Sequence, residues 1–492
     1  ALTTAQAAAL TSSQIRGMTT QQVRALQTED LVALSTGQLA GITSSQAGAL
    51  TTEQIVAFST EQIQGLNSNQ LQALSEAQIQ AMQVEDLQVM SSNQIRALTT
   101  LQVASLTTAQ VLGLQTQQVA AMSLSGVASL TPQQLAVLKT DQLMALSSVQ
   151  VGALTTFQLD GLATDKLVAI EPADLKALSS NQLRALSATQ IAAFSTDQVA
   201  ALSSQQLAVL STEDVRAWRT DQIAALKWSQ MAGLTTAQLS AFKTEQIAAL
   251  QTESLKVLAS AKVAVLQTDQ LQALTTDQFK AMTPGQLAAL PANVITALQT
   301  SDVVVLSADQ IKALSTAQLT QLSDGQMAAL TTEQLLALPA AKLSTLLTAQ
   351  VKALSTEQIA ALSNVQVANL RVDQIVALET SHVAALSNTQ VAALNTAQMQ
   401  VLSTAQIKAL GTSQMAALKS AQILALDTEQ LQAIETQDVA AISLTGRFSL
   451  ETCLAAHHDQ LGQRADLHLV ENGGAVLLDV VGSDAFQRGD FF

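Results

Sequence analysis

The stretch Thr19-Thr20-Gln21-Gln22-Val23-Arg24-Ala25-Leu26 is one copy of an eight-residue unit that decides the fold. Units of the form [S/T]-[T/S]-x-Q-[I/L/V]-x-A-L follow one another from Thr3 to Ile442, which makes 55 units without an insertion. A fixed period of this kind is typical of proteins in which one small structural unit stacks on its neighbours. The sequence therefore predicts a solenoid, although a chain of 492 residues would ordinarily form about three or four globular domains.

The residue types within one unit favour a short helix. With Thr19 at position 1 and Leu26 at position 8, positions 5 and 8 are almost always large and apolar, and position 7 is almost always small. Apolar residues three apart suit a helix better than a strand. Ala, Leu, Gln and Glu are strong helix formers, whereas the aromatic residues typical of strands make up only 2% of the chain.

Capping residues mark where each helix begins. Ser or Thr at position 1 and Gln at position 4 form a capping box, in which the two side chains accept hydrogen bonds from exposed backbone N–H groups. Where position 1 is Lys139, Arg219 or Lys243, we expect Thr at position 2 to cap instead. All five prolines stand at position 1 or 2, where a missing N–H is tolerated best: Pro132, Pro172, Pro284, Pro291 and Pro339.

An eight-residue period also leaves two other architectures open. In one continuous helix, eight residues at about 100° each overshoot two turns by roughly 80°, so the apolar stripe would wind around the helix and fit no coiled-coil period. A β-solenoid would place Thr, Gln, Ala and Leu together on one face. We expect an all-α repeat fold, a solenoid of short single helices with one helix per eight-residue repeat.

Such a short helix is unstable alone and must bury positions 5, 7 and 8 against neighbouring units. Small residues at position 7 indicate a close approach of another helix or backbone there. A leucine at position 7 should therefore disrupt the coil, whereas a leucine at position 6 should be tolerated. Glycine marks this position in six units, at Gly17, Gly41, Gly65, Gly113, Gly161 and Gly233.

The charge balance bears on possible partners. The formal net charge is −15, from 23 basic and 38 acidic residues. Nucleic acid and anionic membrane surfaces attract clustered positive charge, so we expect no nucleic-acid partner. No apolar run approaches the length of a membrane helix, which predicts no membrane insertion. The chain begins at Ala1 within the pattern, and we expect a processed or truncated N-terminus without a signal peptide.

A few residues depart from the pattern. Trp228 at position 2 and Phe157 at position 3 are expected to lie exposed, either as a contact site or, more simply, as lone surface aromatics. Trp218 and Phe58 stand at position 8, where we expect enlarged core residues. Four unusual residues at position 4 are interpreted as drift within a long repeat: Lys166, Lys262, Lys342 and His382.

The pattern stops after Ile442, so we divide the chain into a solenoid at 3–442 and a C-terminal cap or tail at 443–492. Phe448–Leu461 is predicted to form a helix, which makes this a small α+β tail. Leu467–Val470 and Ala475–Val481 are predicted to form a β-hairpin around a Gly-rich turn. The last residues, Gly489–Phe492, would suit an export signal or a docking hook.

The sequence offers no catalytic constellation. Cys453 and His457 are four apart and could share a helix face, but two such residues are weak evidence for a metal site, and His457, His458 and His468 are expected to face solvent. The repeated Ser, Thr and Gln residues are explained by capping. We therefore expect a protein that is not an enzyme, with no catalytic, cofactor-binding or metal-binding residues and no cofactor.

The unit T-T-x-Q-[I/L/V]-x-A-L resembles the Thr/Gln/Ala/Leu octapeptide-repeat arrays of large exported, adhesin-like proteins of Gram-negative bacteria, and the resemblance covers residues 3–442. It implies an extracellular or cell-surface protein. We expect a structural rod, fibre or filament formed by stacking of repeats and by self-association.

The repeat also suggests two alternatives to this structural role. One is a binding solenoid or adhesin stalk that holds a peptide, glycan or surface ligand along its repeat face. The other is binding to ice or another crystal surface through rows of threonine. We disfavour it because it needs threonines exposed on a flat face, whereas capping turns them toward backbone donors.

Overall fold

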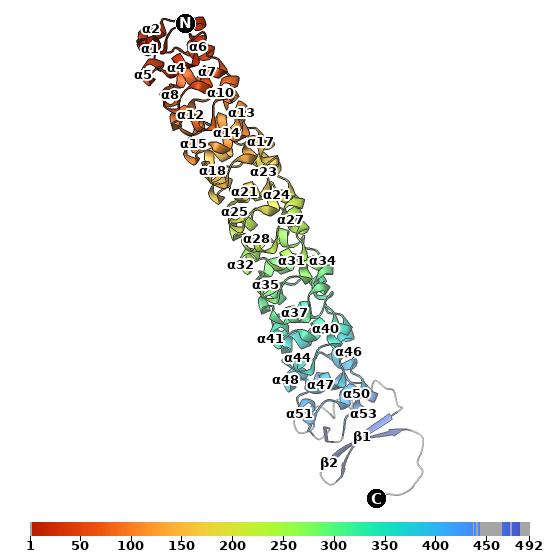
Figure 1. Cartoon of the computed structure of the whole chain (residues 1–492). Helices are drawn as coiled ribbons and strands as arrows, with labels where there is room; N and C mark the ends of the chain where they lie inside the picture. Colours follow the sequence, from red (N-terminus) through yellow and green to blue (C-terminus); the bar gives the residue numbers. More distant parts are fainter. Residues whose placement is uncertain (1, 436, 439–440, 443–464, 473–474, 483–492) are drawn as a thin grey trace. The chain divides into compact units, whose positions relative to one another are not determined.

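The computed structural model describes residues 2–435, 437–438, 441–442, 465–472 and 475–482. Each of the first 54 units forms one short helix, which begins at position 2 and ends at position 5, 6 or 7. The series runs from α1 (Thr4–Ala8) to α53 (Thr428–Gln432), and only η1 (Ala292–Ala297) is a 3₁₀-helix among these. Figure 1 shows the succession of short helices. The predicted all-α repeat with one helix per unit is confirmed, and the continuous helix and the β-solenoid are excluded.

The capping box begins the helices as predicted. In α3 (Thr20–Arg24), the backbone N–H of Gln22 donates to Thr19 Oγ1 at 3.2 Å, and the N–H of Thr19 donates to Gln22 Oε1 at 2.8 Å. Thr19 itself is extended, with φ −72° and ψ 159°. The pair satisfies two backbone donors that a helix start leaves without intrahelical partners.

Position 2 does not take over the cap where position 1 is Lys or Arg, and this expectation is wrong. The helices α18 (Thr140–Met144), α28 (Thr220–Ala224) and α31 (Thr244–Ala248) still begin at position 2 and have no side-chain cap on the first turn. Gln at position 4 still accepts from the N–H of position 1, as Gln142 does from Lys139 at 2.6 Å. Half of the capping box is sufficient to keep the boundary in place.

Positions 5 and 8 form the core. In α7 (Thr52–Ala57) and the residue that follows it, Ile55 is 0% exposed and Phe58 is 4% exposed, and both positions are buried in nearly every described unit. Position 8 returns to extended backbone, and its N–H donates to the carbonyl oxygen of position 5, as Phe58 N does to Ile55 O at 3.2 Å. Burial of about two large apolar side chains in each unit supplies the stability that the isolated helix lacks.

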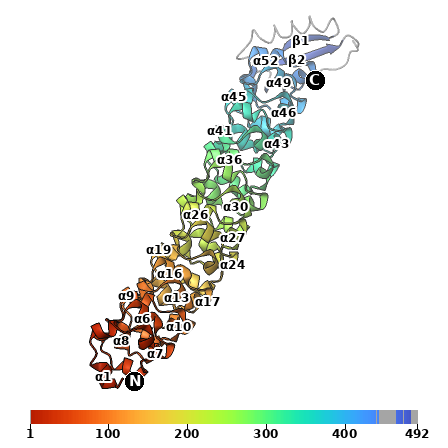
Figure 2. The same ribbon diagram turned by 90° about the horizontal axis from the view of Figure 1, so that it is seen from above.

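The chain divides into two compact units, Ala1–Val257 and Leu258–Phe492, which are described separately. In the first, each helix packs on the helix three further along, so that α7, α10 (Glu76–Ala81) and α13 (Thr100–Ser105) succeed one another (Figures 1 and 2). Hydrogen bonds also reach back 28 to 31 residues, to the unit four before. One turn of the coil therefore takes between three and four units. The second compact unit has the same arrangement of helices, for example between α44 (Thr356–Ala361) and α47 (Thr380–Ala385).

Position 7 is a place of close approach, as predicted. A Cβ atom added at Gly41 or Gly233 would lie 2.6 Å from the carbonyl oxygen of Ser12 or Ser204, each at position 2 of the unit three before. The residue at this same place, position 2 of the unit three before, also stands against Gly65, Gly113 and Gly161. Gly17 differs because it contacts only its own helix.

The C-terminal hairpin is also present. The strands β1 (Ala465–Asn472) and β2 (Ala475–Gly482) pair antiparallel, with Leu469 opposite Leu478 and Asn472 opposite Ala475. Both strands are longer than predicted. The predicted helix Phe448–Leu461 lies outside the described residues, and the division of the chain at residue 442 stays a prediction.

Candidate functional site

Position 4 holds a buried polar side chain that needs several hydrogen-bond partners. Gln occupies it in about three quarters of the units, and most of these glutamines are almost completely buried, with Gln222 and Gln374 at 0% exposure. The sequence pattern assigned this residue only a capping role, which requires one acceptor atom. A buried amide that used only its oxygen would leave two N–H donors without partners, at a cost of about 1–3 kcal/mol.

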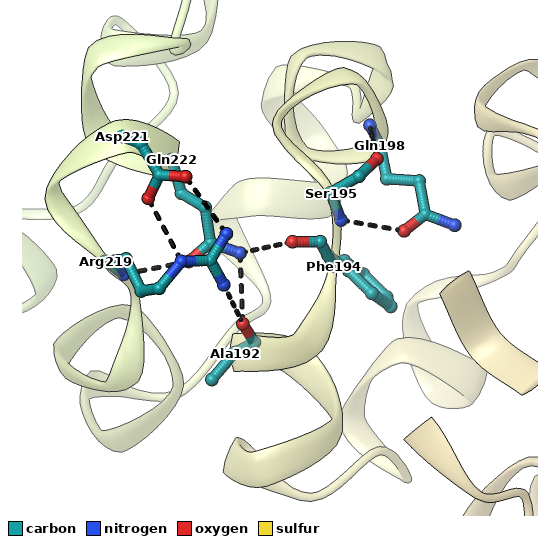
Figure 3. A network of polar contacts seen from close by, with 7 residues as sticks. All are labelled: Ala192, Phe194, Ser195, Gln198, Arg219, Asp221 and Gln222. Carbon is teal, nitrogen blue, oxygen red and sulfur yellow. Dashed lines mark hydrogen bonds and ion pairs between the residues drawn. The ribbon is translucent and has the colours of Figure 1, made fainter. Parts of the chain in front are cut away.

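The structure shows where these donors go. Gln222 in α28 accepts a hydrogen bond from Arg219 N at 2.8 Å through its Oε1 atom. Its Nε2 atom donates to the carbonyl oxygen of Phe194 at 2.6 Å and to that of Ala192 at 3.1 Å (Figure 3). Both carbonyls belong to the unit four before, so one side chain caps its own helix and fastens it to the preceding turn.

This inter-turn contact recurs along the array. The Nε2 atom donates to the carbonyl oxygen of position 8 in the unit four before, and usually also to that of position 5 in the same unit, as Gln62 does to Leu34 O and Leu31 O. Distances to the position-8 oxygen run from 2.5 Å for Gln358 to 2.9 Å for Gln150. Further examples of both contacts are Gln94, Gln158, Gln238, Gln334 and Gln398.

The need for both an acceptor and a donor explains a preference that capping alone does not. A capping box accepts Glu as readily as Gln, yet Glu stands at position 4 in none of the 55 units. Glutamate has no donor and would place a negative charge among carbonyl oxygens. The strong preference for Gln over the acids, with Asp in six units and Glu in none, was the signal in the sequence that pointed to a second partner for Gln.

Two of the unusual residues at position 4 keep the inter-turn contact, so their interpretation as drift is incomplete. Lys166 Nζ donates to Leu138 O at 2.7 Å. Lys342 Nζ donates to Leu314 O at 2.5 Å and to Lys312 O at 2.7 Å. The position-1 residues of these two units are Ala163 and Pro339.

A lysine has donors but no acceptor. It can therefore donate to carbonyl oxygens of the preceding turn, but it cannot cap its own helix. Proline has no N–H to be capped, which makes the pairing of Pro339 with Lys342 consistent. His382 keeps the capping contact instead, because its Nδ1 atom accepts a hydrogen bond from Glu379 N at 3.2 Å.

Long side chains at position 1 add contacts to the same carbonyls. Arg219 donates to Ala192 O at 2.9 Å and forms an ion pair with Asp221 at 3.1 Å (Figure 3). The hydrogen bond from Arg219 lowers the pKa of the Asp221 carboxyl. Both side chains are more than half exposed, so the pair contributes little to stability.

The aromatic outliers lie as predicted. Phe157 is 71% exposed and Trp228 is 63% exposed, whereas Trp218 and Phe58 are buried. The Nε1 atom of Trp218 is buried without a hydrogen-bond partner. Within the part of the chain that the structure describes, Trp228 and Phe157 are therefore the aromatic side chains best placed to contact another molecule.

Several residues named in the predictions for the tail and for metal binding lie outside the part of the chain that the structure describes. Cys453, His457 and His458 lie outside the described residues, as does Gly489–Phe492, and His468 falls within β1. Over the described ranges, no three His, Cys, Asp or Glu residues gather as metal ligands would. Across the same part of the chain, none of the helices is both long and apolar enough to cross a bilayer.

Comparison with known proteins adds one clear match. A family model described as the ALTTAQ repeat matches residues 23–60, 79–116, 167–204, 200–236, 247–284, 295–332 and 375–412, together just over half of the chain. No curated protein is similar to the sequence. The match confirms the repeat array, while the narrower resemblance to exported adhesin-like proteins stays a prediction.

Two solved structures were also found. One, titled "Structure of APUM23-GGAAUUGACGG", is 11% identical, covers 91% of this chain and 95% of its own, and has a TM-score of 0.19. The other, "Structure of APUM23-GGAGUUGACGG", is 11% identical, covers 93% and 96%, and has a TM-score of 0.15. At these TM-scores the likeness carries no argument about fold or ligand.

The exclusion of nucleic acid as a partner is nevertheless corrected. It rested on the negative net charge and on the lack of clustered basic residues in the sequence. A net charge of −15 describes the whole chain and does not exclude a local contact. Self-association and a surface or glycan ligand stay predictions.

Proposed function

This chain belongs to the ALTTAQ repeat family, and on that premise we propose that it is a structural, non-enzymatic solenoid that serves as a spacer. The observation that carries the proposal is that the repeated polar side chains form hydrogen bonds within the solenoid itself. Ser and Thr at position 1 and Gln at position 4 hold the helix start and the preceding turn, as Thr51 and Gln54 do. Groups committed to such contacts are not available for acid–base or nucleophilic chemistry.

A spacer should gain or lose length with the number of units. The test removes eight whole units, residues 99–162, and compares the variant with the full chain by small-angle X-ray scattering and circular dichroism. We expect a smaller maximum dimension, in proportion to the units removed, with unchanged helicity per residue. An unchanged maximum dimension would contradict the proposal, and a loss of helicity would contradict the independence of the units.

We place this spacer outside the cell or on its surface. The support is the resemblance of residues 3–442 to octapeptide arrays of exported proteins. Brief protease treatment of intact producing cells tests the location. We expect the full-length band to disappear while a cytoplasmic marker survives, and protection of the band until lysis would contradict a surface location.

Binding of a ligand along the repeat is a second candidate, favoured by the exposed aromatics. Trp228 is more than half exposed, and aromatic side chains contribute strongly to recognition. The fluorescence of the protein, titrated separately with peptides, glycans and single-stranded RNA, reports contacts at Trp228. A saturable change that is lost in Trp228→Phe and kept in Trp218→Phe would support binding there. No change with any probe would leave the spacer role alone.

A further inference from the structure

We propose that Asp86 and Asp302 are proton-dependent links between turns, which hold the preceding turn when the carboxyl is protonated and release it when the carboxyl is ionised. Both residues stand at position 4, where Gln in most units fastens one turn to the next and Asp stands in six of the 55 units. Asp86 belongs to α11 (Val84–Gln88) in the first compact unit, and Asp302 belongs to α37 (Thr300–Val305) in the second. The two sites are therefore independent examples of one arrangement.

Both residues are buried, and each carboxyl group has one donor. Asp86 is 3% exposed and Asp302 is 4% exposed. The Oδ2 atom of Asp86 accepts from Gln83 N at 2.9 Å, and that of Asp302 accepts from Gln299 N at 3.0 Å. For both residues, the described part of the chain contains no donor to Oδ1. Neither Oδ1 atom is fully buried, so each keeps a little contact with solvent, and a carboxylate in such a buried residue with one hydrogen bond from the chain is incompletely compensated for its lost hydration.

The neighbouring units show which hydrogen bond to the preceding turn is missing at Asp86. Gln78 and Gln94, one unit on either side of Asp86, donate to Leu50 O and Leu66 O at 2.7 and 2.9 Å. Phe58 O stands between these carbonyls in the same register, at position 8 of the unit four before Asp86. Among the described residues, no side chain donates to it.

The second site repeats this relationship. Gln310, one unit after Asp302, donates to Met282 O at 2.7 Å. The carbonyl oxygen of Leu274 lies in the corresponding register, at position 8 of the unit four before Asp302, and no described side chain donates to it. Both aspartates therefore coincide with a gap in the series of inter-turn hydrogen bonds.

The chemistry of the carboxyl group accounts for a switch. An ionised carboxylate only accepts hydrogen bonds, so it places negative charge near carbonyl oxygens that also only accept. One proton converts Oδ1 into an O–H donor and removes the charge. The protonated carboxylic acid then has one acceptor and one donor, which is the combination that Gln brings to this position.

One charged neighbour, Glu85, reinforces the effect at Asp86. Glu85 lies beside it on α11, and Glu61 is carried by α8 (Thr60–Gly65), which packs against α11. The other packing helix, α14 (Thr108–Gly113), has no charged residue. Burial raises the pKa of the Asp86 carboxyl, and repulsion from Glu85 adds to this, while the hydrogen bond from Gln83 opposes it.

At Asp302 the surroundings are mixed. The packing helix α35 (Thr276–Ala281) carries Asp277 and Lys280, and α40 (Asp324–Ala329) carries Asp324. Burial raises the pKa of the Asp302 carboxyl, and the hydrogen bond from Gln299 lowers it less. At both sites a folded-state pKa above the unfolded value means that stabilisation by the proton is complete at acid pH and is lost as pH rises through the folded-state pKa.

The experiment compares the full-length chain with Asp86→Asn/Asp302→Asn between pH 4 and pH 8. Asn has nearly the shape of protonated Asp and keeps a donor and an acceptor at every pH. The matched control is Asp141→Asn/Asp309→Asn, which removes the same charge from position 3, outside the core. Thermal unfolding is followed by circular dichroism, at low protein concentration because the sequence pI is about 4.6.

We expect Asp86→Asn/Asp302→Asn to raise Tm by about 2 °C or more at pH 7.5, and this difference should shrink toward zero at pH 4. The control should show no such pH-dependent difference. Hydrogen exchange over residues 51–90 gives a local readout, with stronger protection in the variant at pH 7.5 only. A difference that is equal at all pH values, absent at all of them, or matched by the control would overturn the proposal.

Discussion

The Nε2 atom of Gln222 lies 2.6 Å from the carbonyl oxygen of Phe194, which belongs to the unit four before. The same glutamine caps its own helix through Oε1. One residue type thus joins two levels of structure, the start of a helix and the stacking of turns. Because the contact is repeated in most units, the turns of each compact unit are held by a series of buried amide groups in addition to apolar contacts.

Replacement of Gln222 by glutamate should test this double role. Glu can still accept from Arg219 N, but it cannot donate to Phe194 O and brings a buried charge. We expect Gln222→Glu to lower the free energy of unfolding by about 1–3 kcal/mol at pH 7, measured by urea denaturation. Gln205→Glu, at position 3 outside the core, is the matched control and should change stability by less than about 0.5 kcal/mol. Equal effects of the two substitutions would contradict the inter-turn role.

Position 7 should not tolerate a large side chain. Ala121 in α15 (Thr116–Ala121) is 6% exposed, and α15 packs against α12 (Ser92–Ala97), whose Ser92 stands at position 2 of the unit three before. We expect Ala121→Leu to destabilise the protein by about 1–3 kcal/mol. Ala120→Leu places the same side chain at the exposed position 6 and should be nearly neutral. Equal melting temperatures for the two variants would refute the close approach at position 7.

Lys342 should contribute as a donor and not merely as a surface charge. We expect Lys342→Met to lower the free energy of unfolding by about 1–3 kcal/mol, because Leu314 O loses its side-chain donor. Lys342→Gln restores a donor and should recover part of the loss. Lys280→Met, at an exposed position 6, serves as the control and should have little effect. Full stability of Lys342→Met would show that the lysine is indeed drift.

The ion pair of Arg371 with Asp373 gives a prediction for titration. The hydrogen bond from Arg371 lowers the pKa of the Asp373 carboxyl below its usual value. The small stabilisation by this pair is therefore present above the unfolded-state pKa and is lost as pH falls through the folded-state pKa. Carboxyl-carbon NMR should show the low pKa, and Arg371→Gln should raise it. An unchanged titration in Arg371→Gln would contradict this cause.

The sequence predicts the content of one unit well because the interactions that form it are local. Thr19 and Gln22 are three residues apart, and Ile55 and Phe58 mark the core with the same spacing. The contacts between turns are harder to predict, since nothing within a single unit specifies how many units make one turn. The burial of Gln222 follows from that number. The strong preference for Gln over Asp and Glu at position 4 indicated a second partner without showing where it lay.

The same limit explains the interpretation of the unusual residues. Lys342 looks arbitrary when only its own unit is considered. It becomes understandable when Pro339, which needs no cap, and Leu314, which needs a donor, are considered together. The residue that suits position 4 thus depends on position 1 of its own unit and on a carbonyl oxygen of the unit four before.

The pairing of Gly113 with Val84 has a consequence for how such a chain can change in copy number. A larger residue at position 2 is accommodated by a glycine at position 7 of the unit three later, so compensating residues lie in units three apart. Duplication or loss of a whole unit separates only the pairs that straddle the junction, which are confined to the few units on either side of it. An insertion of one residue would instead shift position 4 away from its carbonyl partners on both sides of the junction. Growth by complete repeat units is therefore the tolerated mode of length variation, and its structural disturbance stays local however long the array becomes.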